Sequence, residues 1–327
     1  MQRFAHINAY TVEEAISALQ RYGSKASIIA GGTDILGKMK DDILPNYPEA
    51  LINIKTIQDL NIIRESDGIL RIGALATLDN IADHPRIQSA YTTLAQAAAR
   101  TASPHIRAMG TIGGNICQDV RCWYYRNPKN RFPCLRKGGG RCYAIDGDSR
   151  YHSIFGGSVE EGCYAVHPSD TAPALVALNA EAVTSKRIVP IEDFFQVDVE
   201  KTTILDKDEI VTEIRIPKPE NGSKSAFLKV ALRKSIDFPI VNCAVSITES
   251  SNKVKSARIC LNAVYVKPYR AVRAETAVEG RSITKESAED AALAAVSNVQ
   301  PMKDNRYMVS IAQTLVQRSI LACRASV

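Results

Sequence analysis

The chain has 327 residues, of which 45% are hydrophobic and 23% are charged, and its formal net charge is +6. This length allows two domains, and this composition is ordinary for a globular protein. No run of about 18 apolar residues is present, so we expect no membrane-spanning helix. The modest charge, without a nucleic-acid-binding motif, argues against nucleic acid as a partner.

The first residues, MQRFAHINAYTVEEAISAL, lack the apolar stretch that is typical of a signal peptide. We therefore expect a cytoplasmic protein, in a compartment where thiols stay reduced. In such a compartment, clustered cysteines indicate metal or redox chemistry more than disulfides.

Helix and strand patterns alternate over the first 115 residues. Thr11 and Glu14 form a capping box that predicts a helix ending at Gly23. Residues 85–100 predict a single helix with Pro85 near its start. Short strands are expected at residues 26–30, 50–54 and 68–75.

Residues 117–166 show little periodicity. A helix and a strand are expected within residues 170–185, and a strand at 209–216 ends at Pro217. Residues 217–224, PKPENGSK, have the composition of a linker. Three strands and then three helices are expected after it, at residues 225–233, 239–249, 253–264, 269–278, 285–299 and 306–323.

These patterns predict an α+β fold in two domains. The first spans residues 1–217 and contains an insertion at 117–166, and the second, smaller domain spans residues 218–327. We expect a three-stranded sheet with helices in the second domain.

Two pairs of adjacent glycines each follow a short apolar run: Gly31 and Gly32 in AGGTDI, and Gly113 and Gly114 in TIGGN. A glycine pair lets backbone N–H groups approach an anion because no Cβ is in the way. The chain has neither G-x-G-x-x-G nor G-K-[ST], which excludes the Rossmann fingerprint and the P-loop. The two loops are candidates for gripping a diphosphate from two sides, although ordinary tight turns would give the same pattern.

Five motifs, AGGTDI, IGALATL, TIGGN, PSDTAPAL and KVALRKSIDFP, occur in this order across nearly the whole chain. Together they resemble the FAD-binding subunit of the molybdenum hydroxylases, the xanthine dehydrogenase and CO dehydrogenase family. The resemblance implies a two-part FAD-binding domain of the CO dehydrogenase flavoprotein or vanillyl-alcohol oxidase (PCMH) type. It also implies partners: a molybdopterin-containing large subunit and a [2Fe–2S] small subunit, in a heterotrimer that can dimerise.

In that family both glycine loops clasp the FAD diphosphate. Carried onto this sequence, the resemblance implies FAD contacts at Ile29, Ala30, Gly31, Gly32, Thr33, Asp34, Ile35, Gly110, Thr111, Gly113, Gly114 and Asn115. Thr77, Asp170, Val211 and Lys229 match further positions near the flavin, and residues 233–239 match a loop that gates access to the isoalloxazine ring. No residue of this chain is expected to be catalytic.

Five of the eight cysteines have the spacing C-x4-C-x11-C-x7-C-x20-C, from Cys117 to Cys163. In most of the family the TIGGN and S-D-x-x-P motifs are close together, but more than fifty residues separate them here. One branch, 4-hydroxybenzoyl-CoA reductase, resembles this chain in the insertion and in its RCWYY stretch. That resemblance implies a [4Fe–4S] cluster bound by Cys122, Cys134, Cys142 and Cys163, with Cys117 in reserve because it follows the flavin loop.

Other interpretations of the segment stay open: structural zinc, unligated thiols or disulfides. The other cysteines, Cys243, Cys260 and Cys323, have apolar neighbours and are expected in the core. Between residues 121 and 150 there are eight basic residues against two acidic ones: Arg121, Arg126, Lys129, Arg131, Arg136, Lys137, Arg141 and Arg150, against Asp146 and Asp148. Simple solvation of an exposed surface is one explanation. Otherwise these residues indicate either a docking face for an acidic electron carrier or compensation of the charge of a cluster.

The expected function is an FAD- and [4Fe–4S]-containing electron-transfer subunit of a 4-hydroxybenzoyl-CoA reductase-like complex, with ferredoxin as the electron donor. One alternative is the FAD subunit of a xanthine dehydrogenase-like or other aromatic or N-heterocycle hydroxylase that passes electrons to NAD. Another is a scaffold that has lost its cofactor.

Overall fold

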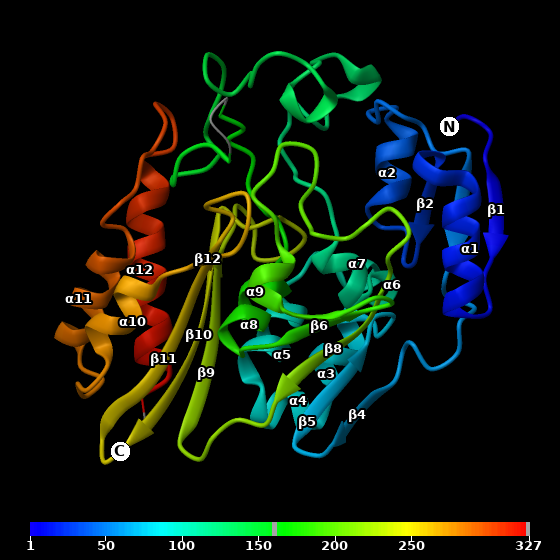
Figure 1. Ribbon diagram of the computed structural model, residues 1–327. Helices are drawn as coiled ribbons and strands as arrows, with labels where there is room; N and C mark the ends of the chain where they lie inside the picture. The colour runs from blue at the N-terminus through cyan, green and yellow to red at the C-terminus, as the bar shows by residue number, and fades with distance from the viewer. Residues whose placement is uncertain (159–161, 325–327) are drawn as a thin grey trace.

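The computed structural model describes residues 1–158 and 162–324. The chain forms three sheets, with strand orders β1-β3-β2, β4-β5-β8-β6-β7 and β12-β11-β10-β9. Figure 1 shows them side by side, with the N-terminal sheet at one end and the C-terminal sheet at the other. Among the described residues, no helix is long and apolar enough to cross a membrane.

The N-terminal sheet is small and parallel, and its strands pair in register around β3. Thr11 caps its first helix by accepting a hydrogen bond from the backbone N–H of Glu14, and Gly23 ends that helix, as predicted. The elements of this part are β1 (Ala5–Asn8), α1 (Val12–Tyr22), β2 (Ala26–Ile29), α2 (Ile35–Lys40) and β3 (Ala50–Asn53).

The central sheet is antiparallel, and helices from before and after the insertion pack on it around one apolar core. Its strands are β4 (Ile63–Ser66), β5 (Ile69–Gly73), β6 (Glu181–Thr184), β7 (Ile188–Pro190) and β8 (Val211–Pro217). The accompanying helices are α3 (Leu78–Asp83), α4 (Pro85–Ala90), α5 (Thr92–Ala99), α6 (Pro104–Met109), α7 (Ile112–Ile116), α8 (Thr171–Ala177) and α9 (Ile191–Phe194).

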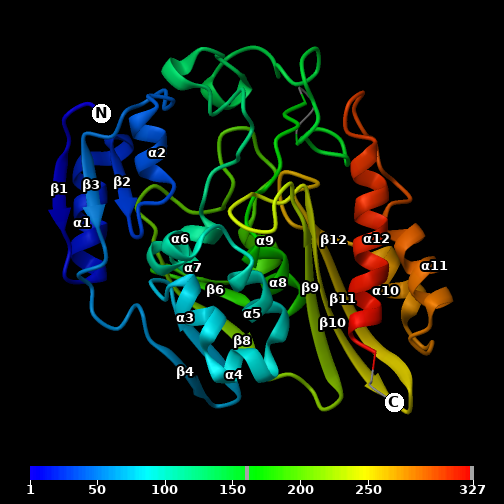
Figure 2. The same cartoon turned by 180° about the vertical axis from the view of Figure 1, so that it is seen from behind.

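The C-terminal sheet is antiparallel and buried on both faces. Cys243 belongs to the core formed with the last three helices, whereas Cys260 belongs to the core shared with α8. Figure 2 shows the last three helices on one side of this sheet and α8 on the other. The elements are β9 (Ser223–Val230), β10 (Val241–Ser250), β11 (Lys253–Asn262), β12 (Tyr269–Arg270), α10 (Val272–Val278), α11 (Lys285–Ala295) and α12 (Tyr307–Ala322).

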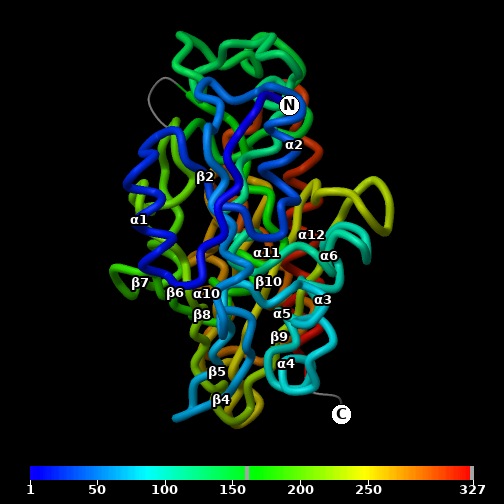
Figure 3. The backbone as a smooth tube through the Cα atoms, turned by 90° about the vertical axis from the view of Figure 1, so that its right-hand side faces the viewer, coloured from blue at the N-terminus to red at the C-terminus, as the bar shows by residue number. Residues whose placement is uncertain are grey.

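The cysteine-rich insertion covers one end of the molecule (Figure 3). It contains short 3-10 turns at Pro128–Asn130 and Leu135–Lys137, and it bridges distant parts of the chain. On one side the backbone N–H of Lys129 donates to the carbonyl of Asp41 after α2, and on the other the Ser149 N–H and hydroxyl donate to Asp304 before α12.

Three expectations need correction. Residues 85–100 form two helices, because buried Tyr91 adopts a non-helical backbone (φ −126°, ψ 46°). The TIGGN glycines lie in the short helix α7 and not in a loop, since Thr111 caps it. The C-terminal sheet has a fourth strand, β12, where the start of a helix was expected, because residues 269–270 pair with β11.

Candidate functional site

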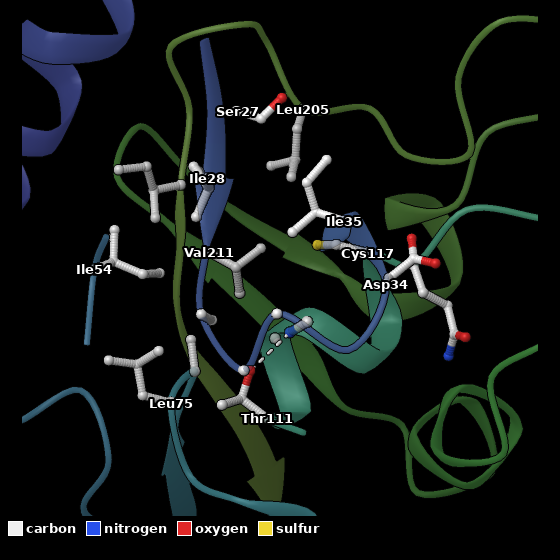
Figure 4. A pocket seen from close by; sticks show the side chains of 18 of the residues that line it. Ser27, Ile28, Asp34, Ile35, Ile54, Leu75, Thr111, Cys117, Leu205 and Val211 are labelled. Carbon is white, nitrogen blue, oxygen red and sulfur yellow. Dashed lines mark hydrogen bonds between the residues drawn. The ribbon is translucent and has the colours of Figure 1, made fainter. Parts of the chain in front are cut away.

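The larger of two cavities at the glycine loops has a volume of about 340 Å³ and lies between the N-terminal and central sheets. Apolar side chains, among them Ile28, Ile54, Leu75 and Leu205, line one part of it (Figure 4). Its wall includes ten of the predicted FAD contacts: Ala30, Gly31, Gly32, Thr33, Asp34, Ile35, Thr111, Gly113, Gly114 and Val211.

The two glycine segments touch each other through their backbones. A Cβ on Gly31 would lie 2.0 Å from the carbonyl oxygen of Met109, just before the TIGGN segment. Gly32 has φ +73°, a conformation that an L side chain rarely adopts. Only glycine at these positions lets the chain leave β2, contact the second segment and enter α2.

Thr111 and Thr77 fix the second glycine segment to the central sheet. The Thr111 hydroxyl accepts a hydrogen bond from the N–H of Gly114 at 3.2 Å (Figure 4). The two threonines also form an antiparallel bridge, and Thr77 caps α3 by accepting from Asn80. The backbone of this segment is therefore held rigidly beside the first.

The second cavity, of about 220 Å³, lies on the other side of the glycine segments. The predicted residues in its wall are Thr33, Asp34, Gly110, Thr111, Gly114, Asn115 and Asp170. Residues 236–238 of the predicted gating loop line it as well. The two cavities therefore meet at the two glycine segments. This arrangement suits an elongated ligand with an anionic centre and a larger group at each end. FAD has this shape.

Three of the predicted FAD contacts line neither cavity: Ile29, Thr77 and Lys229. Ile29 points into the core, and Thr77 supports Thr111 as described above. The Lys229 ammonium donates to the Asp170 carboxylate at 2.6 Å, with both side chains only 3% exposed. Asn242 donates to the same carboxylate, so Lys229 helps to hold Asp170 in place.

The carboxylate of Asp34 turns away from the apolar part of the larger cavity and toward the insertion (Figure 4). It pairs with Arg121 at 2.9 Å and Arg126 at 2.8 Å, and it accepts the backbone N–H of Asp119. Burial would raise the pKa of Asp34, but Lys38 and the two arginines hold it below its usual value.

Asp119 is the second acid of this ionic network. Burial would raise its pKa, but the charges of Lys38, Arg136 and Arg126 keep it well below its usual value. The Tyr125 hydroxyl donates to its carboxylate. Arg136 approaches the same carboxylate to 3.6 Å, so charged contacts run continuously from the first glycine segment into the insertion.

The four cysteines predicted to bind a cluster surround one small cavity inside the insertion. Cys122, Cys134, Cys142 and Cys163 all line it, together with Tyr124, Tyr125 and Tyr143. Cys117 lies elsewhere, in the wall of the larger cavity beside Ile35 (Figure 4). Cys243, Cys260 and Cys323 are buried in the core, as expected.

The four thiols are not arranged like the ligands of a single metal ion. Within residues 1–158 and 162–324, no group of three or more His, Cys, Asp or Glu is placed to hold a single metal ion. A tetrahedral zinc ion needs all four sulfurs within about 2.3 Å of one point. A cubane instead binds each thiolate to a different iron and so tolerates sulfurs that are farther apart. None of the cysteines forms a disulfide.

Burial keeps three of these thiols protonated when no metal is bound. It raises the pKa of Cys122 to about 12 and also raises the pKa of Cys134 and Cys142. A bound metal centre would displace these protons. The residues fit such a centre because they combine convergent thiols with buried cations at the wall.

Arg136 and Lys137, which we grouped with the docking candidates, do not project into solvent. The Arg136 side chain is 2% exposed, and its Nε and Nη2 atoms have no hydrogen-bond partner among the described residues. The same is true of the buried Lys137 Nζ. For these two residues the docking interpretation is wrong, since both cationic groups lie near the ring of Tyr125 and Arg136 also lines the cysteine cavity.

Sequence reasoning missed Gln118 and His152, and it considered Cys117 only as a reserve ligand that follows the flavin loop. Gln118 lines both glycine-loop cavities, and Cys117 lines one of them. His152, in the insertion, lies 3.3 Å from the Cys122 sulfur through its Nε2 atom. Gln118 and Cys117 follow the TIGGN segment closely, and this position was a usable signal. No local pattern identified His152.

Two family models match the chain. The FAD binding domain in molybdopterin dehydrogenase matches residues 2–219, and the CO dehydrogenase flavoprotein C-terminal domain matches residues 226–323.

Among curated relatives, the aldehyde oxidoreductase FAD-binding subunit PaoB of Escherichia coli (strain K12) is 34% identical over 83% of this chain and 84% of its own length. The carbon monoxide dehydrogenase medium chain of Hydrogenophaga pseudoflava is 29% identical over 99% of this chain and 98% of its own. The solved carbon monoxide dehydrogenase from the same organism matches with a TM-score of 0.77, at 28% identity, over 99% of both chains.

The domain models and these full-length similarities agree with the paired glycine segments and the order of the sheets. The chain belongs to the FAD-binding medium subunits of the molybdenum hydroxylase family, and it is an oxidoreductase subunit.

Proposed function

We propose that this chain carries FAD and a [4Fe–4S] cluster and serves as the electron-transfer subunit of a molybdenum hydroxylase-type complex. The observation that carries the proposal is the convergence of Cys122, Cys134, Cys142 and Cys163 on one cavity. When bound, the two cofactors would supply one- and two-electron redox chemistry between an external carrier and the molybdenum subunit.

The chain itself contributes placement and electrostatics. The two adjacent glycine segments would hold the FAD diphosphate, and the cysteine cavity would hold the cluster. The ionic network of Asp34, Asp119 and their arginines supports this arrangement by fixing the insertion against the first glycine segment. We propose a domain boundary at residue 217, where β8 of the central sheet ends and the chain continues to β9 of the C-terminal sheet. The proposed insertion, residues 117–166, lies within the first domain.

The proposed partners are a molybdopterin-containing large subunit and a [2Fe–2S] small subunit. For the external carrier we propose a ferredoxin, as in reductive dehydroxylation of an aromatic acyl-CoA, because an additional one-electron centre suits a one-electron donor. The similarity to the E. coli aldehyde oxidoreductase subunit supports a second candidate, a complex that oxidises aldehydes.

Cofactor analysis tests the core of the proposal. The anaerobically purified chain should contain one FAD and about four irons and four sulfides, as expected for one cubane. Changing Cys122, Cys134, Cys142 or Cys163 to serine should remove the iron, whereas Cys117→Ser and Cys243→Ser should keep it. Zinc without sulfide in the wild type would contradict the proposal.

The assembled complex separates the two candidates. Aromatic acyl-CoA should be reduced with reduced ferredoxin as donor, and aldehydes should leave the complex unreduced. Rapid bleaching of the flavin by aldehydes, with no acyl-CoA turnover, would favour the aldehyde-oxidising function instead.

A further inference from the structure

His152 is held against the sulfur of Cys122. Its Nε2 atom lies 3.3 Å from the Cys122 Sγ, and the residue is only 1% exposed. The Nδ1 atom has no partner among the described residues, so the tautomer with its proton on Nε2 can donate to sulfur.

The backbone around His152 is fixed from the far end of the sequence. Asn305, just before α12, donates through Nδ2 to the carbonyl of His152 at 2.9 Å. The His152 N–H donates to the Ser149 carbonyl, and Ser149 in turn donates to Asp304. Residues just before α12 therefore help to fix the backbone of His152. Its imidazole is held in place with Nε2 beside the Cys122 sulfur.

Arg136 approaches the cavity from another wall. Its Nη1 atom donates to the carbonyl of Asp198 at 3.3 Å, and its Nη2 atom pairs with the Asp119 carboxylate at 3.6 Å. Neither Nε nor Nη2 has a hydrogen-bond partner among the described residues. Cys163 lines the same cavity as this guanidinium. Asp119 balances the charge of Arg136, but buried N–H donors beside thiols are costly unless an acceptor, such as the thiolates of a bound cluster, occupies the space between them.

We propose that His152 and Arg136 tune the metal centre in the cysteine cavity and raise its reduction potential. His152 donates an N–H···S hydrogen bond to Cys122, and Arg136 places a buried positive charge at the cavity wall. This inference rests on the proposed cluster and adds the residues that set its properties. Donors and positive charge at the sulfurs stabilise the reduced form more than the oxidised form, because the reduced form carries one more negative charge. Their loss therefore lowers the potential.

The test is an EPR-monitored redox titration of the full chain in its complex. His152→Phe and Arg136→Met should each shift the midpoint of the cluster to a more negative potential, while iron content stays the same. The control is Tyr143→Phe, which changes an aromatic residue in the same cavity wall whose hydroxyl makes no hydrogen bond to a cysteine among the described residues. Unchanged midpoints in both variants, with iron retained, would overturn the inference and leave the proposed cluster intact.

A measurement on the wild type keeps the test independent of variant folding. Protein labelled with ¹⁵N in the histidine imidazoles should show a weak ¹⁵N coupling to the reduced cluster by pulsed EPR, typical of a hydrogen-bonded nitrogen. No coupling would overturn the role of His152, and a strong coupling would show that it is a ligand and not a donor. Absence of iron in the wild type would instead reject the proposed cluster, and this inference with it.

Discussion

Asp34 of the first glycine segment accepts a 2.8 Å hydrogen bond from Arg126 of the insertion, 92 residues away in sequence. Arg121 and Lys38 also contact this carboxylate, and its side chain is 18% exposed. The predicted flavin loop and the cysteine insertion are therefore parts of one electrostatic unit.

Replacing Asp34 with alanine should destabilise the chain and weaken FAD retention. The change leaves partly buried cations without their counter-ion, and breaking such an arrangement costs about 3 kcal/mol. Thermal unfolding and the FAD-to-protein ratio check this expectation. Asp42→Ala is the control, since the Asp42 side chain is exposed and, among the described residues, its carboxylate accepts a hydrogen bond only from Gln2. Equal melting temperatures and FAD contents for both variants would contradict it.

The glycine segments allow a second matched comparison. Gly31→Val should empty the FAD site, because a side chain there would collide with the Met109 carbonyl and push the two segments apart. Gly37→Ala, six residues further along and within α2, meets nothing within 4 Å and should retain FAD. It should also stabilise the helix by up to about 1 kcal/mol. Flavin absorbance after gel filtration measures both, and full occupancy in Gly31→Val would refute the proposed role of the glycine segments.

The sequence allowed prediction of the fold class and most elements, because they depend on local periodicity, caps and turn residues. The contact between Gly31 and Met109 could not be predicted, since it joins segments that only the tertiary fold brings together. The choice of Cys122 over Cys117 came from a family resemblance and not from spacing.

The burial of Arg136 was missed for a different reason. A charged side chain in an irregular segment is normally exposed. Here its burial depends on Asp119 and the cysteine cavity, and neither is visible in the local sequence.

His167 should make the protein less stable in mild acid. It is fully buried, and burial lowers its pKa to about 4. A histidine with a folded-state pKa below its unfolded value of about 6.5 binds more protons in the unfolded chain between these values. Its stabilising effect is complete above the unfolded pKa and falls as the pH drops, by on the order of 3 kcal/mol in total.

Unfolding free energies measured between pH 4.5 and 7.5 check this expectation. His167→Phe should show a shallower loss of stability in acid, because phenylalanine cannot be protonated and can keep the contact with Phe195. His105→Phe is the control, as His105 is exposed. A pH profile for His167→Phe that is parallel to the wild type would show that other groups cause the acid sensitivity.

Arg131 and Arg141 replace Arg136 and Lys137 as the docking candidates. Both are exposed, and Arg141 lies 4.5 Å from the ring of Tyr143, which lines the cysteine cavity. An acidic ferredoxin that docks here would approach the proposed cluster closely, and opposite charge would accelerate the encounter. Changing both arginines to glutamate should slow reduction by ferredoxin about tenfold at low salt, and less at high salt where charges are screened.

Stopped-flow reduction of the assembled complex at several salt concentrations provides the measurement. Lys253→Glu is the control, because Lys253 is exposed at the β10–β11 turn, at the opposite end of the molecule from the insertion (Figure 1). Iron and FAD contents should match the wild type in all variants, since these side chains project into solvent. If the double variant and the control are reduced equally fast, docking does not use this surface. If NADH reduces the complex efficiently and ferredoxin is inert, the electron carrier and the direction of transfer proposed here are both wrong.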